Sequence, residues 1–212
     1  MENKKTKKGL LWIIIAVAVI AVAAVVVGIL YFMPPKKEDP TARAQVATQF
    51  VEAYRNRDQL TQFDLLIYDA RAQWEDDLID EHGSEEAFCK LVQDQADRQG
   101  IQVTINSFDD YLRDYHKQDL IYKQEAYGDY TLTTTVVSNE QVSASEAFDL
   151  ITATASAVGT PYFADGLATT IHEVYRITVD LTIDGTIKDL SEQYQVYMVN
   201  HDGQWKVLSY TT

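Results

Sequence analysis

Hydrophobic and polar positions divide the chain into one long apolar run and a segment in which apolar residues recur with a regular period. The run is residues 10–33, LLWIIIAVAVIAVAAVVVGILYFM, and it contains no charged side chain. About 20 apolar residues in a helix cross the ~30 Å hydrocarbon core of a bilayer. The pattern therefore predicts a transmembrane helix over residues 10–33, in contact with the lipid bilayer, and one domain over residues 40–212.

The segments that flank the apolar run predict its orientation. Residues 1–9 form a tail with four lysines, and the positive-inside rule keeps such a tail in the cytoplasm. Residues 34–39 include two prolines and predict a short, stiff linker. The run is longer than the apolar core of a cleaved signal peptide, and residues 31–33 lack the small side chains of a cleavage site. We therefore expect an uncleaved signal anchor in the cell membrane, with an extracellular C-terminal domain.

The first part of this domain has the period of amphipathic helices. Apolar residues recur every three or four positions, and capping residues flank several of these segments. Ser84 and Ser143 are expected N-caps, and Phe88, Leu91 and Val92 are expected on an inner helical face. The predicted helices run from Pro40 to Arg55, from about Gln59 to Glu81, from Ser84 to Gly100, and from Ser143 to Gly159.

Elsewhere in the domain the period changes to two, which is typical of strands. A short strand is predicted at 101–105, and two strands at 120–127 and 130–137 that meet at Gly128. Three further strands are predicted at 171–183, 192–200 and 205–210, joined by turns at Asp184-Gly185 and Asp202-Gly203 into an antiparallel meander. Helices followed by such strands predict an α+β fold with the helices packed on one face of a curved antiparallel sheet.

Charge and cysteine content narrow the expected partners and location. The net charge is −14; residues 1–39 carry six lysines and three acidic residues, which leaves −17 for residues 40–212. An acidic domain is repelled by phosphate backbones, so we expect no nucleic-acid partner. Cys89 is the only cysteine, and we expect a buried thiol without a disulfide. An extracytoplasmic domain without disulfides is typical of a Gram-positive bacterium.

Two stretches of the domain carry a resemblance to a known superfamily. They are VATQFVEAYRNRD at 46–58, and YRITVDLTIDG at 175–185 followed by EQYQVYMVNHDGQWKVLSY at 192–210. Together they resemble the NTF2-like (cystatin-like cone) superfamily, in which an N-terminal helix lies in the concavity of a curved sheet. Residues 143–170 fit the superfamily pattern less well. The layout is similar to anchored NTF2-like proteins of Gram-positive bacteria and, more weakly, to VirB8-type subunits of conjugation and type IV secretion machines.

A catalytic site resembling that of ketosteroid isomerase needs a carboxylate base and hydrogen-bond donors that converge in an apolar pocket. Tyr54, Tyr175, Asp180 and Tyr197 are the candidates. The pattern favours structural roles, because Asp180 falls on a polar strand face and Tyr175 on an apolar one. The four histidines lack the spacing of metal ligands. We therefore expect no catalytic, cofactor-binding or metal-binding residue, and no cofactor.

Three functional hypotheses remain, and the first is preferred. The first is a non-enzymatic anchored domain that binds protein partners or a cell-envelope ligand on the sheet's concave face. The second is a scaffold subunit of a secretion or conjugation apparatus, expected to form a homo-oligomer. The third is a small-molecule enzyme, which requires an open apolar cavity with a buried carboxylate.

Overall fold

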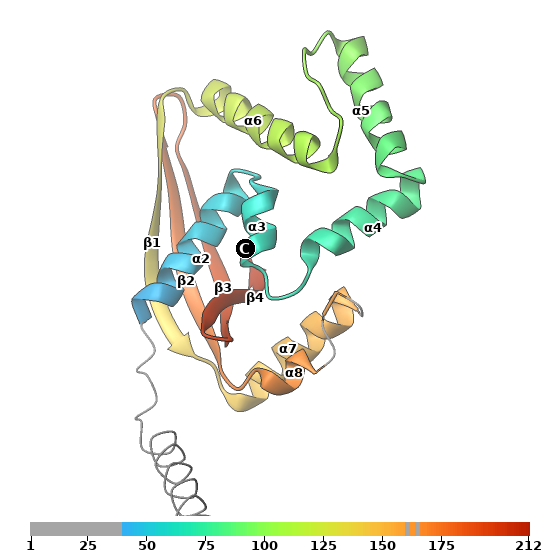
Figure 1. The fold of residues 1–212 in the computed structure, drawn as a ribbon. Helices are drawn as coiled ribbons and strands as arrows, with labels where there is room; N and C mark the ends of the chain where they lie inside the picture. Colours follow the sequence, from blue (N-terminus) through green and yellow to red (C-terminus); the bar gives the residue numbers. More distant parts are fainter. Residues whose placement is uncertain (1–39, 160–161, 164–165) are drawn as a thin grey trace, which may run out of the picture. The chain divides into compact units, whose positions relative to one another are not determined.

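The computed structural model describes residues 40–159, 162–163 and 166–212, all within one structural unit, Pro40–Thr212 (Figure 1). The predicted tail (1–9), transmembrane helix (10–33) and linker (34–39) lie outside the described residues. None of the described helices is long and apolar enough to cross a membrane.

The described chain is an α+β fold in which helices pack against a four-stranded antiparallel sheet, as the sequence predicts. The strands are joined in the order β1-β2-β3-β4, so each lies beside its neighbour in sequence. The helices are α2 (Pro40–Arg55), α3 (Gln59–Leu65), α4 (Ala70–His82), α5 (Glu85–Gln99), α6 (Phe108–Tyr127), α7 (Ala144–Val158) and α8 (Leu167–Thr170). The strands are β1 (Tyr130–Gln141), β2 (Val174–Gly185), β3 (Leu190–His201) and β4 (Gln204–Thr211).

The main core lies between α2 and one face of the sheet. Alternate residues of β2 and β3 point to this face and are almost fully buried, which confirms the predicted alternation. Helix α2 covers them with Phe50 and Val51, and the Phe50 ring lies 5.0 Å from that of Tyr210 in β4. The strand residues at the centre of this core are Ile177, Val179, Leu181, Ile183, Tyr194, Val196, Met198 and Val207.

The other face of the sheet is also covered over part of its area, which the prediction of a single helical face missed. Ser143 caps α7 as predicted, because its hydroxyl accepts from the backbone N–H of Glu146. Ile151 of α7 and Leu167 of α8 then pack in a second core with the strand residues whose side chains point to this other face. Those strand residues are Val174, Tyr197, Val199 and Leu208. Strand β3 is therefore buried on both faces near Tyr197.

The helix predicted over residues 59–81 is two helices, α3 and α4. The chain is extended between them, where Leu66 forms a parallel bridge with Val207 and the Ile67 N–H donates to the Val207 carbonyl at 2.9 Å. Asp69 then accepts from the N–H of Ala72 and begins α4. Apolar residues recur with the helical period on both sides of this break, so the apolar pattern alone does not reveal it.

The strands predicted at 101–105 and 120–127 are wrong. Residues 101–107 have no regular secondary structure, and Gln93 of α5 bonds both Ile105 N–H and the Val103 carbonyl. The second segment lies in α6, which Ser107 caps by accepting from the N–H of Asp110. Gly128 thus ends a helix and does not join two strands. The turn predicted at Asp184-Gly185 falls at residues 186–189, because β2 continues through Gly185.

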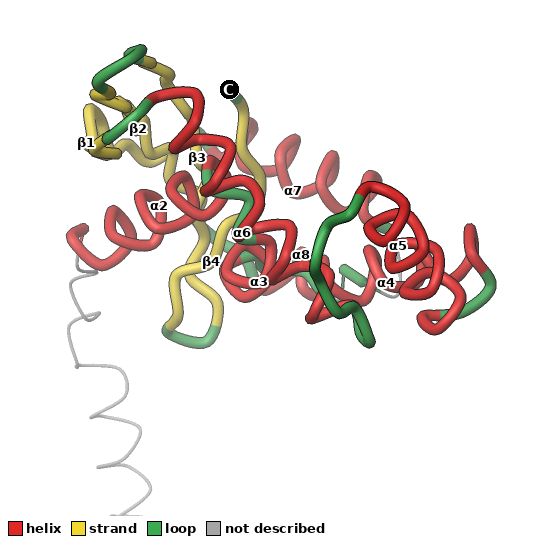
Figure 2. Tube along the Cα trace, turned by 90° about the horizontal axis from the view of Figure 1, so that it is seen from above, coloured by secondary structure: helices red, strands yellow, loops and turns green. Residues whose placement is uncertain are grey.

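Helices α4 and α5 and the start of α6 form a helical arm, which lies to one side of the sheet in both views (Figures 1 and 2). It has a small core of its own, in which Phe88, Cys89 and Phe108 are buried beside Trp74. Cys89 is buried as predicted, but Leu91 is 51% exposed instead of lying on the inner face. Ring contacts at 5.2–5.5 Å join Phe108 to Trp74 and to Phe88.

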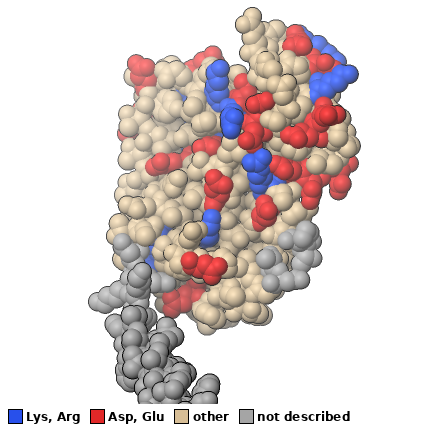
Figure 3. Space-filling model, viewed as in Figure 1, with Lys and Arg blue, Asp and Glu red and all other residues tan. Residues whose placement is uncertain are grey.

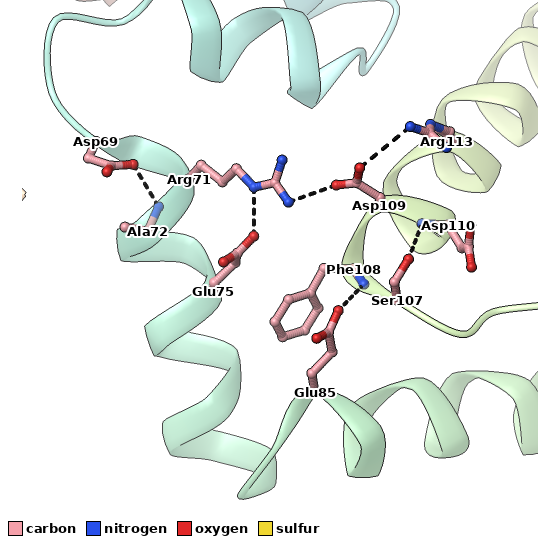
Figure 4. A network of polar contacts seen from close by, with 10 residues as sticks. All are labelled: Asp69, Arg71, Ala72, Glu75, Glu85, Ser107, Phe108, Asp109, Asp110 and Arg113. Carbon is pink, nitrogen blue, oxygen red and sulfur yellow. Dashed lines mark hydrogen bonds and ion pairs between the residues drawn. The ribbon is translucent and has the colours of Figure 1, made fainter.

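Polar contacts also tie the three arm helices together (Figure 4). Arg71 of α4 donates to Glu75 at 2.6 Å and to Asp109 of α6 at 2.8 Å. Glu85, the first residue of α5, accepts from the backbone N–H of Phe108 at 2.7 Å. The ends of the helices therefore hold one another, with few apolar contacts to the sheet.

Candidate functional site

A cavity of about 350 Å³ lies where the C-terminal end of α2, the start of α3 and the inner side of α6 meet. We call it the basic pocket. Its lining combines three cationic side chains with four tyrosines, one carboxylate and two amides. The residues are Tyr54, Arg55, Arg57, Gln59, Gln62, Tyr115, Asp119, Tyr122, Lys123 and Tyr127.

The sharp end of α2 places two arginines at the pocket. The helix ends at Arg55. Arg57 then takes a left-handed backbone conformation with φ 54°, which residues other than glycine seldom adopt. Asp58 then caps α3 by accepting from Thr61. The reversal between α2 and α3 thereby directs Arg57 toward α6, where its guanidinium carbon lies 5.2 Å from the ring centre of Tyr115.

One carboxylate on α6 serves two of the cations. Asp119 accepts from the ammonium of Lys123, one helical turn further on, and lies 3.3 Å from Nε of Arg57. Arg57 also donates to the Tyr115 hydroxyl. The Lys123 side chain is only 3% exposed, whereas that of Arg57 is about half exposed. Lys123 therefore lies at the base of the pocket and Arg57 at its rim.

Arg55 approaches the same pocket from α2. It donates to the Tyr127 hydroxyl at 2.9 Å, and its other terminal nitrogen lies 3.9 Å from the Glu192 carboxylate of β3. Its Nε is buried and has no hydrogen-bond partner among the described residues. A buried donor without an acceptor is uncommon in folded proteins. Arg55 thus has unused hydrogen-bonding capacity beside the cavity.

The pocket changes the acid–base behaviour of its lysine. Burial, followed by the positive charges of Arg55 and Arg57, lowers the pKa of Lys123 to about 8, even though Asp119 accepts from its ammonium. Near neutral pH the amine is still mostly protonated, so all three cations carry charge there. On β3, burial and the hydrogen bond to Glu192 raise the pKa of Tyr194.

This concentration of positive charge is unusual for the domain. Residues 40–212 carry 12 lysines and arginines against 29 acidic residues, and three of the 12 line this one pocket. On the face drawn in Figure 3, basic side chains form a few groups among more numerous acidic ones. The basic pocket is therefore a local concentration of positive charge in a domain whose net charge is negative.

Two further cavities, of about 410 and 340 Å³, lie nearby and share Tyr68 and Tyr210 in their linings. The larger one has no charged side chain in its lining, and the smaller one has Asp77. Rings of Tyr54, Tyr194 and Tyr210 pack against one another at 5.0–5.8 Å, so side chains fill the space between α2 and the sheet. Of the three cavities, the basic pocket offers the most distinctive chemistry.

The candidates from the sequence do not come together. Tyr54 lies on the α2 side of the sheet, whereas Asp180 and Tyr197 belong to the opposite face, where Asp180 accepts from Gln193 at 2.7 Å. Tyr175 lies on the α2 face, but its ring is stacked under the guanidinium of Arg43, 3.8 Å from its carbon. Of the four, Tyr54 alone lines the basic pocket.

Sequence reasoning missed the residues that make the basic pocket, namely Arg55, Arg57, Asp119 and Lys123. In the sequence, Arg55 and Arg57 indicate only the end of the first predicted helix. The segment that holds Lys123 was predicted as a strand, and this hid the helical spacing of Asp119 and Lys123. A capped α6, with Ser107 before two acidic residues, was the signal that would have revealed this spacing.

Comparison with known proteins adds no relatives. No protein-family model matches the chain, and no match to it was found among curated proteins or solved structures. Within the described residues, no group of three or more histidine, cysteine, aspartate or glutamate side chains is placed to hold a metal ion. The basic pocket is thus the candidate site that the geometry itself supplies.

Proposed function

We propose that this chain is a membrane-anchored, extracytoplasmic domain of NTF2-like architecture that binds a ligand without transforming it. The observation that carries the binding role is the basic pocket, a cavity of about 350 Å³ with converging charged and hydroxyl groups. Sites for small molecules in proteins are typically concave and have volumes of this order.

The arrangement of α2 and the sheet supports an NTF2-like architecture. An N-terminal amphipathic helix lies along one face of an antiparallel sheet, and β2, β3 and β4 form a meander with Trp205 in the last strand. Register shifts at Val136/Ser138 and at Tyr197/Met198 are the kind of irregularity that bends a sheet around a helix.

Binding is preferred over catalysis because of where the reactive groups lie. The carboxylate of Asp180 and the hydroxyl of Tyr54 are on opposite faces of the sheet, so they cannot act on one substrate. In the basic pocket, Asp119 already accepts from Lys123 and lies 3.3 Å from Arg57, so the cations of the pocket itself occupy this carboxylate.

The anchor and its orientation rest on the apolar residues 10–33 and the lysines before them. A protease added to intact spheroplasts should digest the domain, while a tag on residues 1–9 stays protected. A cytoplasmic protein of the same cells serves as the control for intact membranes. Protection of residues 40–212 would contradict the proposed location.

The binding role is tested by filling the pocket. Gln59 lines it, so we expect Gln59→Trp to abolish binding of small molecules found by ligand-observed NMR with full-length protein in neutral detergent. Gln118→Trp places the same side chain on an exposed position of α6 and should leave binding unchanged. A screen of anionic, neutral and cationic compounds that finds no ligand sensitive to Gln59→Trp would refute the binding role of this pocket.

A further inference from the structure

We infer that the basic pocket selects a small oxyanion, the carboxylate or phosphate group of a ligand, and holds it between Arg55, Arg57 and Lys123. This inference rests on the proposed binding function and specifies the chemical class of its ligand. It assigns the cationic groups to recognition and the tyrosines to the walls around the rest of the ligand.

The balance of charge around the cavity favours an anion. The lining has three cationic side chains. Asp119 in the lining and Glu192 next to Arg55 supply two negative charges, so one positive charge is not balanced. The contact between Arg55 and Glu192 is long, at 3.9 Å, and both side chains are partly exposed. An ion pair of this kind is weak and is easily exchanged for a better acceptor.

Two other groups of basic side chains in the domain are balanced by carboxylates. Arg176 lies 3.5 Å from both Glu140 and Glu146. In the helical arm, Arg71 and Arg113 are paired with Glu75 and Asp109. Neither cluster has an excess of positive charge, and neither lines any of the three cavities described above. The excess charge and the cavity coincide at the basic pocket.

The donors in the pocket suit an oxygen anion. Guanidinium groups bind carboxylate and phosphate through paired N–H bonds, which are stronger than bonds between neutral groups. One terminal nitrogen of Arg55 donates to Tyr127, and the other, 3.9 Å from Glu192, makes no recorded hydrogen bond within the described part of the chain and is such a donor. The Lys123 ammonium has three N–H donors, and among the described residues its recorded hydrogen bond goes to Asp119 alone. Donors from two helices therefore remain for a bound oxyanion.

The tyrosine side chains set limits on the rest of the ligand. Tyr54, Tyr115, Tyr122 and Tyr127 supply ring surface and hydroxyl groups around the cations. Aromatic walls favour a flat or apolar body attached to the anionic group. We therefore expect an aromatic carboxylate to bind more tightly than inorganic phosphate, which can use only the cationic part of the pocket.

Affinity measurements with matched probes test the inference. Full-length protein in neutral detergent is titrated calorimetrically with benzoate, inorganic phosphate and benzamide, the neutral analogue of benzoate. Benzoate and phosphate should bind, and benzamide should bind at least about tenfold more weakly, because it lacks the charge that the donors recognise. Arg57→Gln and Lys123→Met should each weaken benzoate binding by about tenfold or more.

Matched variants on the same helix control for the loss of charge. Arg113→Gln and Lys117→Met remove the same charges from exposed positions of α6 and should change benzoate affinity by less than about twofold. Equal binding of benzamide and benzoate, lost in Gln59→Trp, would overturn the oxyanion inference and leave the binding function standing. Binding that no pocket variant affects would overturn both, as would the absence of binding by every probe and every screened compound.

Discussion

Lys123 is a buried amine that the fold holds in its charged form at neutral pH. Its side chain is almost fully enclosed, and its pKa is lowered to about 8 by burial and by Arg55 and Arg57. A group whose pKa is lower in the folded state than in the unfolded state reduces stability wherever the unfolded chain binds the extra proton. At pH 7 this reduction amounts to about 3 kcal/mol, since each pKa unit corresponds to about 1.4 kcal/mol.

The stability difference between the parent protein and Lys123→Met should therefore depend on pH. The destabilising effect of Lys123 is fully present below pH 8 and disappears as the pH rises toward the unfolded value of 10.5. Between pH 8 and pH 10, the parent protein should gain about 2 kcal/mol relative to the variant. Urea unfolding of both full-length proteins across this range measures the difference.

Because Lys123→Met is compared with the parent protein at each pH, the titration of other groups cancels from the difference in unfolding free energy. Burial raises the pKa of the Cys89 thiol and of Tyr194, so both groups lose stabilising protonation as the solution becomes alkaline. These losses occur equally in parent and variant and cancel. Lys117→Met removes a lysine from an exposed position of the same helix and controls for the loss of a positive charge. A constant difference for Lys123→Met would show that Lys123 has an ordinary pKa.

At the scale of elements, the junction of α6 and β1 is held against the turn between β2 and β3. Gly128 ends α6 with φ 73°, and the backbone on either side of it bonds this turn. The Ile187 N–H donates to the Tyr127 carbonyl at 3.0 Å, and the Asp129 N–H donates to the Thr186 hydroxyl at 3.1 Å. A side chain at Gly128 would point into Thr186 and Ile187.

Gly128→Ala should thus destabilise the fold more than an alanine at another left-handed glycine. Gly203, with φ 79° in the β3–β4 turn, has open space where a Cβ would lie. There we expect only the conformational penalty of about 1 kcal/mol. Gly128, with φ 73° and ψ −146°, lies near a region that is almost exclusive to glycine, so its conformational penalty is larger and adds to a steric clash, and a total of about 2 kcal/mol or more is expected. Equal losses of unfolding free energy for Gly128→Ala and Gly203→Ala would show that the β2–β3 turn moves away from the new methyl group at little energetic cost.

Elements with local signals could be predicted from the sequence. Ser84 and Ser143 are N-caps because their hydroxyls accept from helix N–H groups, and Gly100 ends α5 in a left-handed conformation. The long alternation of β2 and β3 also appears as predicted, because one of its faces meets α2 along its length. These features depend on neighbours within a few residues or on one continuous buried face.

Two misplaced elements depend on distant contacts or on exposed apolar residues. The pairing of Leu66 with Val207 separates α3 from α4, and the N-cap residue Asp69 is a local sign that a second helix begins. In α6, Leu120 and Ile121 are substantially exposed, so their positions do not mark the buried face of the helix. The buried positions are instead Phe108, Leu112, Lys123 and Tyr127, and a charged lysine does not contribute to an apolar pattern.

The candidate site escaped prediction for a related reason. Its cations come from the end of α2, from the turn between α2 and α3, and from α6, and helices α3, α4 and α5 separate these segments in sequence. Each half of the basic pocket looks like an ordinary charged helix surface by itself. Only the packing of α3 against α6 and of Tyr127 against the main core brings the two halves together.

At the scale of the molecule, the sheet and the helical arm have separate cores. The main core contains fully buried residues of three strands, whereas the arm core consists of four buried side chains and a few partly buried ones. Aromatic contacts through Trp74, Tyr111 and Tyr115 connect the arm to the basic pocket. The arm should consequently open more readily than the sheet, because it buries less apolar surface.

Hydrogen exchange measured by mass spectrometry tests this difference. Amides of α5 should exchange at least about tenfold faster than those around Ile177 and Val196, which are fully buried. Phe88→Ala should accelerate exchange in α4 and α5 further and leave β2 and β3 unchanged, because Phe88 packs only in the arm core among the described residues. Uniform exchange across the domain would show that arm and sheet open as one cooperative unit.

The packing of α2 against β2, β3 and β4 also determines when this domain can complete its folding. Phe50 and Val51 are synthesised early, yet the residues that bury them belong to β2, β3 and β4. Such non-local pairing slows folding, because the intervening chain must close on itself before the contacts form. During synthesis the apolar face of α2 is not fully covered until β4 has left the ribosome, so ribosome-bound chains stalled before Trp205 would leave part of that face exposed to chaperones and proteases.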